Sequence, residues 1–245
     1  MANNLITIDG PSGAGKSTIA RLAALRLGMR YLDTGAMYRA ITLACMRAGV
    51  KLGDGEAVAA VAKQAQLRCE LSLDQPMKVF LGAEDVTGKI RTQEVTRNIH
   101  YIADVREIRD LLVAMQRKIG ENEEIVTEGR DQGTVVFPNA SLKIYMFALP
   151  EVRAKRRYNE LVQRGQQVSY EEVLQDVAKR DYLDMDREVG ALRKAPDALE
   201  IDTSELTPEQ TAEEIVKLAK SRLAMRTRKI DKNTLDRMRK TSGLS

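Results

Sequence analysis

The fold of this chain is decided by Leu5-Ile6-Thr7-Ile8-Asp9, which runs directly into Gly10-Pro11-Ser12-Gly13-Ala14-Gly15-Lys16-Ser17-Thr18. The first part predicts a short apolar strand, and a helix is expected to begin at or just after Lys16. The turn between them has the spacing G-x-x-x-x-G-K-[ST] of a phosphate-binding loop. Its three glycines allow backbone conformations that a Cβ would forbid, so successive N–H groups can surround one anion at a helix N-terminus.

Two side chains extend the chemistry of this loop. Lys16 supplies a mobile cation for β- and γ-phosphates, and the Ser17 hydroxyl is the expected ligand of Mg²⁺. The alternative is a chance match in an ordinary glycine-rich turn, but the motif requires a strand before it and a helix after it, and both are expected here. The loop therefore predicts a nucleoside triphosphate as ligand.

The composition is that of a globular protein with an aliphatic core. The chain has 245 residues, of which 43% are hydrophobic and 30% charged, with no tryptophan and three phenylalanines. This length suffices for one α/β domain with insertions. Cys45 and Cys69 are isolated and His100 is the only histidine, which excludes a disulfide framework, a histidine-built zinc site and a serine–histidine pair.

Charge and hydropathy indicate where the protein acts. No apolar run approaches membrane-spanning length and no apolar leader precedes the first strand, so we expect a cytoplasmic protein. Residues 224–245 hold seven lysines and arginines against two aspartates, which accounts for the whole net charge of +4. The body is therefore close to neutral and is not expected to bind nucleic acid, whereas the basic tail is a candidate contact for RNA.

Strands and helices alternate along most of the chain. Further strands are expected at residues 31–32, 124–127, 142–147 and 198–201, with helices between them and a capping box at Ser169-x-x-Glu172. Residues 67–73 and 78–81 instead alternate between polar and apolar around a turn, which predicts an inserted antiparallel hairpin, with a third strand at residues 85–86. The sequence thus predicts an α/β three-layer sandwich around a central parallel sheet, with a small antiparallel β region inserted.

Polar residues gather where the predicted parallel strands end, which is where such sheets bind ligands. Thr34 follows the second strand, and Arg130 and Asp131 follow a later one. Planar, permanently charged guanidinium groups suit a site that faces two anionic groups and neutralises charge on a transferred phosphoryl group. The candidate arginines are Arg39, Arg91, Arg109, Arg130, Arg153, Arg156, Arg157, Arg180 and Arg187.

Each arginine group has a simpler alternative. A lone arginine is more often part of a solvated helix face, but Arg130 lies between Gly129 and Asp131 at a strand end. Arg153 and Arg157 fit a helical lid that closes over phosphates, or only a charged helix surface. If Arg180, Asp184 and Arg187 share one helix face, they suit a ribose phosphate, or else form intrahelical ion pairs.

Motifs of other nucleotide-binding classes are missing. No guanine-reading N-K-x-D sequence occurs, and the strand at Ile125-Val126 does not end in D-E. Asp131, with Thr34 nearby, is placed to accept from an amino group such as N4 of cytosine, and Arg109 to donate to its O2 and N3. We expect a kinase for a small phosphorylated acceptor. The open alternatives are a UMP or AMP kinase and a nucleotide-gated switch protein that binds RNA or the ribosome.

Five stretches, in order along the chain to about Leu223, together resemble one family. They are residues 6–16, 32–39, 88–95, 128–138 and 180–187, with the sequences ITIDGPSGAGK, LDTGAMYR, G-x-IRT-x-EV, EGRD-x-GTVVFP and RD-x-x-D-x-x-R. The combination is similar to that of the bacterial cytidylate kinases, the (d)CMP kinases of the P-loop nucleoside monophosphate kinase group. Adenylate, thymidylate and shikimate kinases share only the first stretch. The resemblance implies Mg²⁺-dependent phosphoryl transfer from ATP to CMP and dCMP, by a monomer.

The resemblance also implies roles for individual residues. ATP would lie on the loop of residues 10–18, with Mg²⁺ at Ser17, and CMP would lie opposite. The implied catalytic residues are Lys16, Arg130, Arg153, Arg157 and Arg187. The implied acceptor-binding residues are Thr34, Tyr38, Arg39, Arg109, Arg130, Asp131, Arg180, Asp184 and Arg187. No general base is expected, since the acceptor phosphate is already anionic.

The resemblance implies a kinase domain over residues 1–223, with an acceptor-binding insertion at about 35–120, a lid at about 150–187 and the tail 224–245 outside it. Two positions depart from the family pattern. Gln132 stands where an apolar residue is usual, and Gly190-Ala191-Leu192 replaces Ala-Pro-Leu. The first departure is expected to affect packing beside the base site, and the second the flexibility of the lid.

Overall fold

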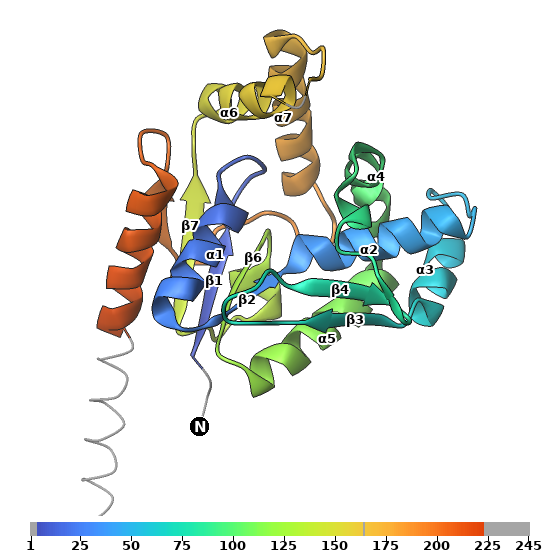
Figure 1. Cartoon of the computed structure of the whole chain (residues 1–245), viewed down its shortest axis with the longest axis horizontal. Coiled ribbons are helices and arrows are strands. Elements are labelled where there is room, and N and C mark those ends of the chain that lie inside the picture. The colour runs from blue at the N-terminus through green and yellow to red at the C-terminus, as the bar shows by residue number, and fades with distance from the viewer. Residues whose placement is uncertain (1–3, 164, 223–245) are drawn as a thin grey trace, which may run out of the picture.

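A computed structural model of the protein describes residues 4–163 and 165–222, and its centre is a parallel sheet (Figure 1). The five strands lie in the order β2–β6–β1–β7–β8. They are β1 (Leu5–Asp9), β2 (Arg30–Asp33), β6 (Ile125–Gly129), β7 (Leu142–Phe147) and β8 (Leu199–Asp202), and every pairing between neighbours is parallel. The predicted parallel sheet is confirmed.

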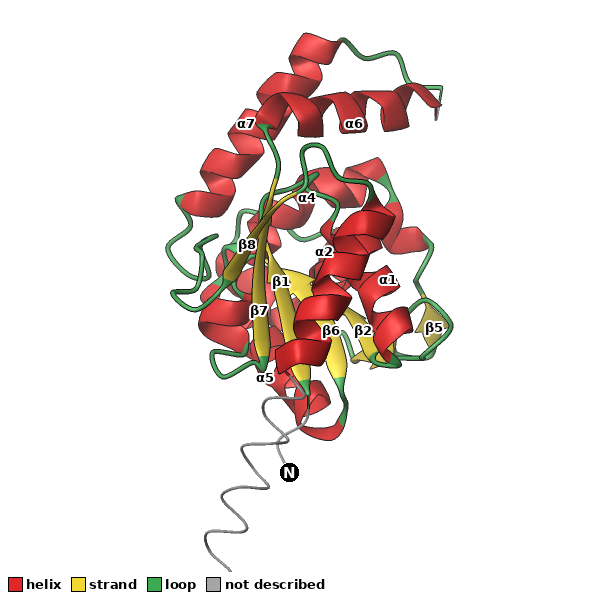
Figure 2. Ribbon diagram, turned by 90° about the vertical axis from the view of Figure 1, so that its left-hand side faces the viewer, coloured by secondary structure: helices red, strands yellow, loops and turns green. Residues whose placement is uncertain are grey.

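Helices cover both faces of the sheet (Figure 2). On one face α1 (Lys16–Leu27) and the helix at residues 208–222 pack on a cluster that includes Ile6, Ile8 and Val126. On the other face α2 (Thr34–Arg47) and α5 (Arg106–Asn122) pack on a cluster that includes Leu5 and Ile125. Neighbouring residues of one strand belong to opposite clusters because side chains alternate along a strand. The three-layer sandwich is confirmed.

The insertion lies between α2 and α5 and forms its own small sheet. It contains α3 (Gly55–Gln64), β3 (Leu67–Glu70), β4 (Lys78–Leu81), β5 (Glu84–Asp85), a 3₁₀ turn (Lys89–Arg91) and α4 (Gln93–Ala103). The three strands pair antiparallel in the order β3–β4–β5, as predicted. Buried Val79 and Val86 belong to the same core cluster as α2, which attaches this region to one side of the main sheet.

A pair of helices, α6 (Pro150–Gln163) and α7 (Tyr170–Met185), stands beyond the carboxyl ends of the strands (Figures 1 and 2). The pair has its own small cluster of buried residues, among them Ala154, Leu161 and Val177. The predicted capping box is present, since Ser169 Oγ accepts from the backbone of Glu172 at 3.1 Å and Glu172 Oε2 from that of Ser169 at 2.9 Å.

Arg187 lies outside the α7 helix, so the condition that it shares one helix face with Arg180 and Asp184 is not met. The helix ends at Met185, and the chain turns back so that the Leu192 N–H donates to the carbonyl of Asp184 at 2.7 Å. Gly190 makes this return with φ +69°, a conformation that favours glycine. Arg187 therefore reaches its partners from a loop rather than from a helix face.

A second feature that the sequence did not predict follows β6. Residues Gln132–Val136 form one wide π-helical turn, in which the Phe137 N–H donates to the Gln132 carbonyl at 2.7 Å. Such turns are rare in proteins, but those that do occur are often found at functional sites. This one begins directly after Arg130 and Asp131.

Within residues 4–163 and 165–222, no helix is both long and apolar enough to cross a bilayer. The basic tail predicted at residues 224–245 lies outside the described residues.

Candidate active site

The phosphate-binding loop joins β1 to α1 at the middle of the sheet. Gly10, Gly13 and Gly15 have φ values of +154°, +80° and +88°, all in the region that favours glycine. A Cβ on Gly10 would collide with the carbonyl oxygen of Met146 in β7. The loop is therefore packed tightly on the neighbouring strand and leads into the N-terminus of α1.

Lys16 is buried at the start of α1, and its Nζ donates to the carbonyl of Pro11 at 2.7 Å. Burial, and to a smaller extent the positive charge of Arg130, lower the pKa of Lys16 to about 7. A polyanion on the loop would favour the charged form. The loop thus holds its cation against its own backbone.

Ser17 donates through Oγ to Glu128 Oε1 at 2.7 Å, and the Tyr31 hydroxyl lies 3.3 Å from the same oxygen. Sequence analysis gave Glu128 no role, although an acidic residue near the end of an apolar strand beside β1 was a signal for one. Oxygen ligands from a hydroxyl and a carboxylate suit Mg²⁺, which usually completes its shell with phosphate oxygens and water. Ser17 and Glu128 are therefore the residues that fit a metal.

The lid touches the phosphate loop through Arg153. This buried guanidinium donates to the carbonyl of Ser12 at 3.0 Å, and to both oxygens of Asp181 in α7 at 2.9 and 2.6 Å. Arg157, which was grouped with it, lies half-buried and donates to Glu160 at 2.8 Å along α6. Arg156 donates to the carbonyl of Thr203 at 2.5 Å, so it anchors the lid to the sheet rather than to the loop.

Asp184 gathers two of the predicted arginines. Its Oδ2 accepts from Arg130 Nε at 2.6 Å and its Oδ1 from Arg187 Nη2 at 3.1 Å. Arg187 Nε also donates to Asp104, just after α4, at 2.6 Å, which links the lid to the insertion. Burial alone would raise the pKa of Asp184, but the charge of Arg130 holds it below its ordinary value.

Two further arginines are not fully paired within the described residues. In the part of the chain that the structure describes, no hydrogen bond or ion pair engages Arg180, and burial and then the charge of Arg130 lower its pKa to about 10, with Arg39 and Arg157 adding to the effect. Arg39 donates to Asp33 at 3.1 Å. Its Nε is buried with no partner among the described residues. Arginines from α2, the end of β6 and the lid thus lie near one another.

The predicted base-reading residues form a buried cluster. Arg109 and Asp131 are paired with each other, and the Arg109 guanidinium lies 5.7 Å from the centre of the Tyr38 ring. Burial raises the pKa of Asp131 despite this partner, and it raises that of Tyr38 to about 12. The Thr34 hydroxyl donates to the Glu128 carbonyl at 2.7 Å. A base would have to exchange partners with the Arg109–Asp131 pair.

Both departures from the family pattern have a structural account. A Cβ on Gly190 would collide with the Arg109 guanidinium, so the chain leaving the lid packs directly on the Arg109–Asp131 pair. The buried Gln132 side chain accepts from Thr127 Oγ1 at 3.1 Å and donates to Gln116 Oε1 in α5 at 3.1 Å. Gln132 therefore replaces apolar packing by hydrogen bonds under the loop that carries Arg130 and Asp131.

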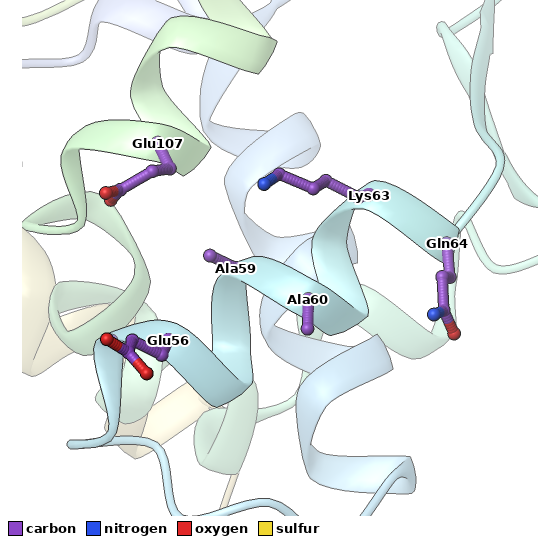
Figure 3. Close-up of a pocket in the computed structure, with 7 residues that line it drawn as sticks. Glu56, Ala59, Ala60, Lys63, Gln64 and Glu107 are labelled. Atoms are coloured by element: carbon purple, nitrogen blue, oxygen red, sulfur yellow. The ribbon is translucent and has the colours of Figure 1, made fainter.

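A surface groove elsewhere contains none of these residues (Figure 3). It lies between α3 and α5 and is lined mainly by Glu56, Ala59, Ala60, Lys63, Gln64 and Glu107. Its charged side chains are of both signs and do not converge on one point, as Figure 3 shows. The candidate site is therefore the cluster at the carboxyl ends of β1, β2 and β6.

Known proteins are similar to this chain over most of its length. A sequence profile described as cytidylate kinase matches residues 6–221. The cytidylate kinase of Bacillus subtilis is 46% identical over 211 residues, which cover 86% of this chain and 94% of that protein. The cytidylate kinase of Clostridioides difficile is 42% identical over 216 residues, or 88% and 98% of the two chains. A solved shikimate kinase from Bacteroides thetaiotaomicron shares 13% identity at a TM-score of 0.45, covering 89% and 98%, which is too distant to bear on function.

Proposed function

The chain belongs to the cytidylate kinase family, and on that premise we propose that it transfers the γ-phosphoryl group of ATP to CMP and dCMP, giving CDP and dCDP. The observation that carries the proposal is a second cluster of cations close to the phosphate loop. The unengaged guanidinium of Arg180 lies there within electrostatic reach of Arg130, Arg39 and Arg157. A protein that only bound a triphosphate would have no use for this second cluster.

The chemistry needs positioning and charge stabilisation rather than a general base. The acceptor phosphate is already a nucleophile, and the charge that develops on the transferred group is neutralised by fixed cations. Arg130 and Lys16 lie within electrostatic reach of each other, so they suit the space between donor and acceptor. Arg153, held by Asp181 against Ser12, would exclude water when the lid closes.

Cytosine is the base that the buried cluster suits best. In a low-dielectric site, the Asp131 carboxylate would accept from the N4 amino group, and Arg109 would donate to O2 and N3. Uracil presents an oxygen where cytosine has N4, so it would face the carboxylate with no donor. The buried cluster therefore favours CMP and dCMP over UMP, the nearest alternative acceptor.

Mg²⁺ would be held by Ser17 and Glu128 together with phosphate oxygens, and when bound it would neutralise charge on the donor phosphates. We also propose the division into a core, an acceptor-binding insertion at about 35–120 and a lid at about 150–187. Lid residue Arg187 joins insertion residue Asp104 across the site, which supports a site shared by these parts. A cytoplasmic monomer stays a prediction from the sequence.

The test is ADP formation from ATP and Mg²⁺ with CMP, dCMP, UMP, AMP and dTMP supplied in turn. We expect CMP and dCMP to support turnover and UMP to be poorer by about tenfold or more, since an unpaired buried polar group costs ~1–3 kcal/mol. Preference for UMP or AMP would contradict the cytosine assignment. Turnover of ATP that ignores every acceptor would favour the switch protein instead.

A further inference from the structure

Asp9, the last residue of β1, holds a loop that belongs to the other half of the site. Its side chain is almost fully buried. Oδ1 accepts from the Gln132 N–H at 2.8 Å and Oδ2 from the Gly133 N–H at 2.7 Å. One carboxylate therefore fixes two consecutive peptide groups at the start of the π-helical turn.

The same residue also begins the phosphate loop. Asp9 pairs with Gly129 in the parallel ladder, and its backbone continues directly into Gly10. The chain that leaves Gly129 carries Arg130 and Asp131 before it reaches the anchored Gln132. The Asp9 carboxylate is thus a short physical link between the donor loop and the loop that supplies the acceptor arginine and the base-reading carboxylate.

Apart from the two hydrogen bonds to Asp9, close packing also restricts the loop that follows Gly129. Leu5, Thr7 and Asp9 share one face of β1, since side chains alternate, and this face becomes polar toward the site. A Cβ on Gly133 would lie 3.0 Å from Thr7 Oγ1 and 3.3 Å from Asp9 Oδ2, so the loop lies directly against the strand. Gln132 closes the other side through Thr127 and Gln116.

A carboxylate at this position has a cost. Burial raises the pKa of Asp9 to about 7, although the two backbone N–H groups and Lys16 favour the ionised form and Asp131 opposes it. At a purely structural position, burying a neutral group would cost less free energy than burying a carboxylate. A charged group retained at the expense of stability is typical of a functional site.

We propose that Asp9 is a positioning residue that fixes Arg130 and Asp131 relative to the phosphate loop, and so sets the alignment of the two nucleotides. The proposal rests on the proposed kinase function. The nearly complete burial of its side chain leaves Asp9 little surface for direct contact with a nucleotide. It acts through the two backbone N–H groups that it accepts.

The test is Asp9→Asn in the full chain. The amide retains one acceptor oxygen but places an NH₂ group against the second backbone N–H, so one anchor is lost. We expect the KM for CMP to rise and kcat/KM for CMP to fall about tenfold to hundredfold, because small misplacements of catalytic groups are costly. The affinity of the free enzyme for ADP, measured by calorimetry, should change less than threefold, since the loop retains its own glycines and Lys16.

The matched control is Asp74→Asn, which removes an exposed carboxylate that accepts from Ser72 Oγ. This control should leave both the kcat/KM for CMP and the affinity for ADP unchanged. Hydrogen exchange should be faster in Asp9→Asn for the peptide over residues 129–136 and unchanged over residues 10–18. If Asp9→Asn does not fold, the same measurements are made on Asp9→Glu, which keeps the charge but displaces it by one methylene. We again expect a large loss in kcat/KM for CMP and a small change in ADP affinity.

Equal losses of CMP and ADP affinity, or an unchanged kcat/KM for CMP, would overturn the positioning role. Failure of the proposed function is distinguishable, because the wild-type protein itself would then show no CMP-dependent turnover.

Discussion

Two regions are expected to bind phosphate: the loop of residues 10–18 (the donor loop), and the cluster of Arg39, Arg109, Arg130 and Arg180 (the acceptor cluster). They are built in opposite ways. The loop is built from consecutive residues, and its cation Lys16 is held by the loop's own Pro11 carbonyl. The acceptor cluster draws on α2, α5, α7 and the end of β6, and most of its cations are paired with carboxylates from other elements, as Arg130 is with Asp184 and Arg109 with Asp131.

The difference follows from the groups used. Backbone N–H groups at a helix N-terminus carry partial charges and need no counter-ion when empty. Guanidinium groups brought together without an anion repel one another, so they need carboxylates to hold them in place. The loop is therefore ready for its ligand, whereas the acceptor cluster must exchange ion-pair partners when a nucleotide enters. Substitutions in the two regions should differ accordingly.

The largest effect is expected from Arg130→Ala. Loss of this cation removes charge stabilisation between the nucleotides and should lower kcat at least ~100-fold, which corresponds to ~3 kcal/mol. The chain should stay folded, because Asp184 keeps Arg187 as its partner. Steady-state kinetics with thermal unfolding measures both. The control is Arg47→Ala, which removes an exposed arginine paired with Glu84. A near-normal rate in Arg130→Ala would place this residue outside the site.

A smaller effect, confined to the acceptor side, is expected from Gly190→Ala. Although alanine is usual here in the family pattern, this chain turns at Gly190 with φ +69°, and the new methyl group would collide with the Arg109 guanidinium. We therefore expect the KM for CMP to rise about tenfold while the KM for ATP stays unchanged. The control is Gly49→Ala, since Gly49 has φ +67° and nothing within 4 Å of its Cβ position. Both variants bear the same backbone strain of ~1–2 kcal/mol. Matching CMP kinetics in the two would show that the contact with Arg109 does not matter.

The smallest effect is a pH dependence of stability at Asp9, where the two regions meet. Its pKa is about 7 in the folded protein against an ordinary value of 3.8. Between these values the folded protein retains a proton that the unfolded chain has lost, so this group's contribution to the free energy of unfolding falls as pH rises from about 4 to 7. The Asp9→Asn variant has no ionisable group at this position, so its free energy of unfolding does not fall with pH in this way. Its Tm relative to wild type should therefore rise by a few °C between pH 5 and pH 8.

Thermal unfolding of both proteins at the two pH values measures this difference. Asp74→Asn is the control, because an exposed carboxylate whose pKa lies below its ordinary value contributes no change between pH 5 and pH 8. A Tm difference for Asp9→Asn that is flat across the range would mean that Asp9 is ionised in both states.

Much of the donor half could be predicted from the sequence alone, because its contacts are local. The loop, the strand before it and the helix after it occupy about twenty consecutive residues. The positions that need positive φ are marked by glycines in the sequence. The same holds for the hairpin of β3 and β4, where polar and apolar residues alternate, and for the capping box at Ser169. The arginines of the acceptor half were also visible as residue types.

The tertiary structure decided which partners those residues have. Asp9 and Gln132 are more than a hundred positions apart, and Arg187 leaves the helix to reach Asp104. Neither the π-helical turn after Asp131 nor the packing of Gly190 on Arg109 has a periodic signal in the sequence. Hydrogen bonds and ion pairs between distant segments depend on how the chain closes, and local propensity holds no information about that. The sequence alone determined a phosphate loop and a set of cations, and the fold decided that they form two facing sites joined at Asp9.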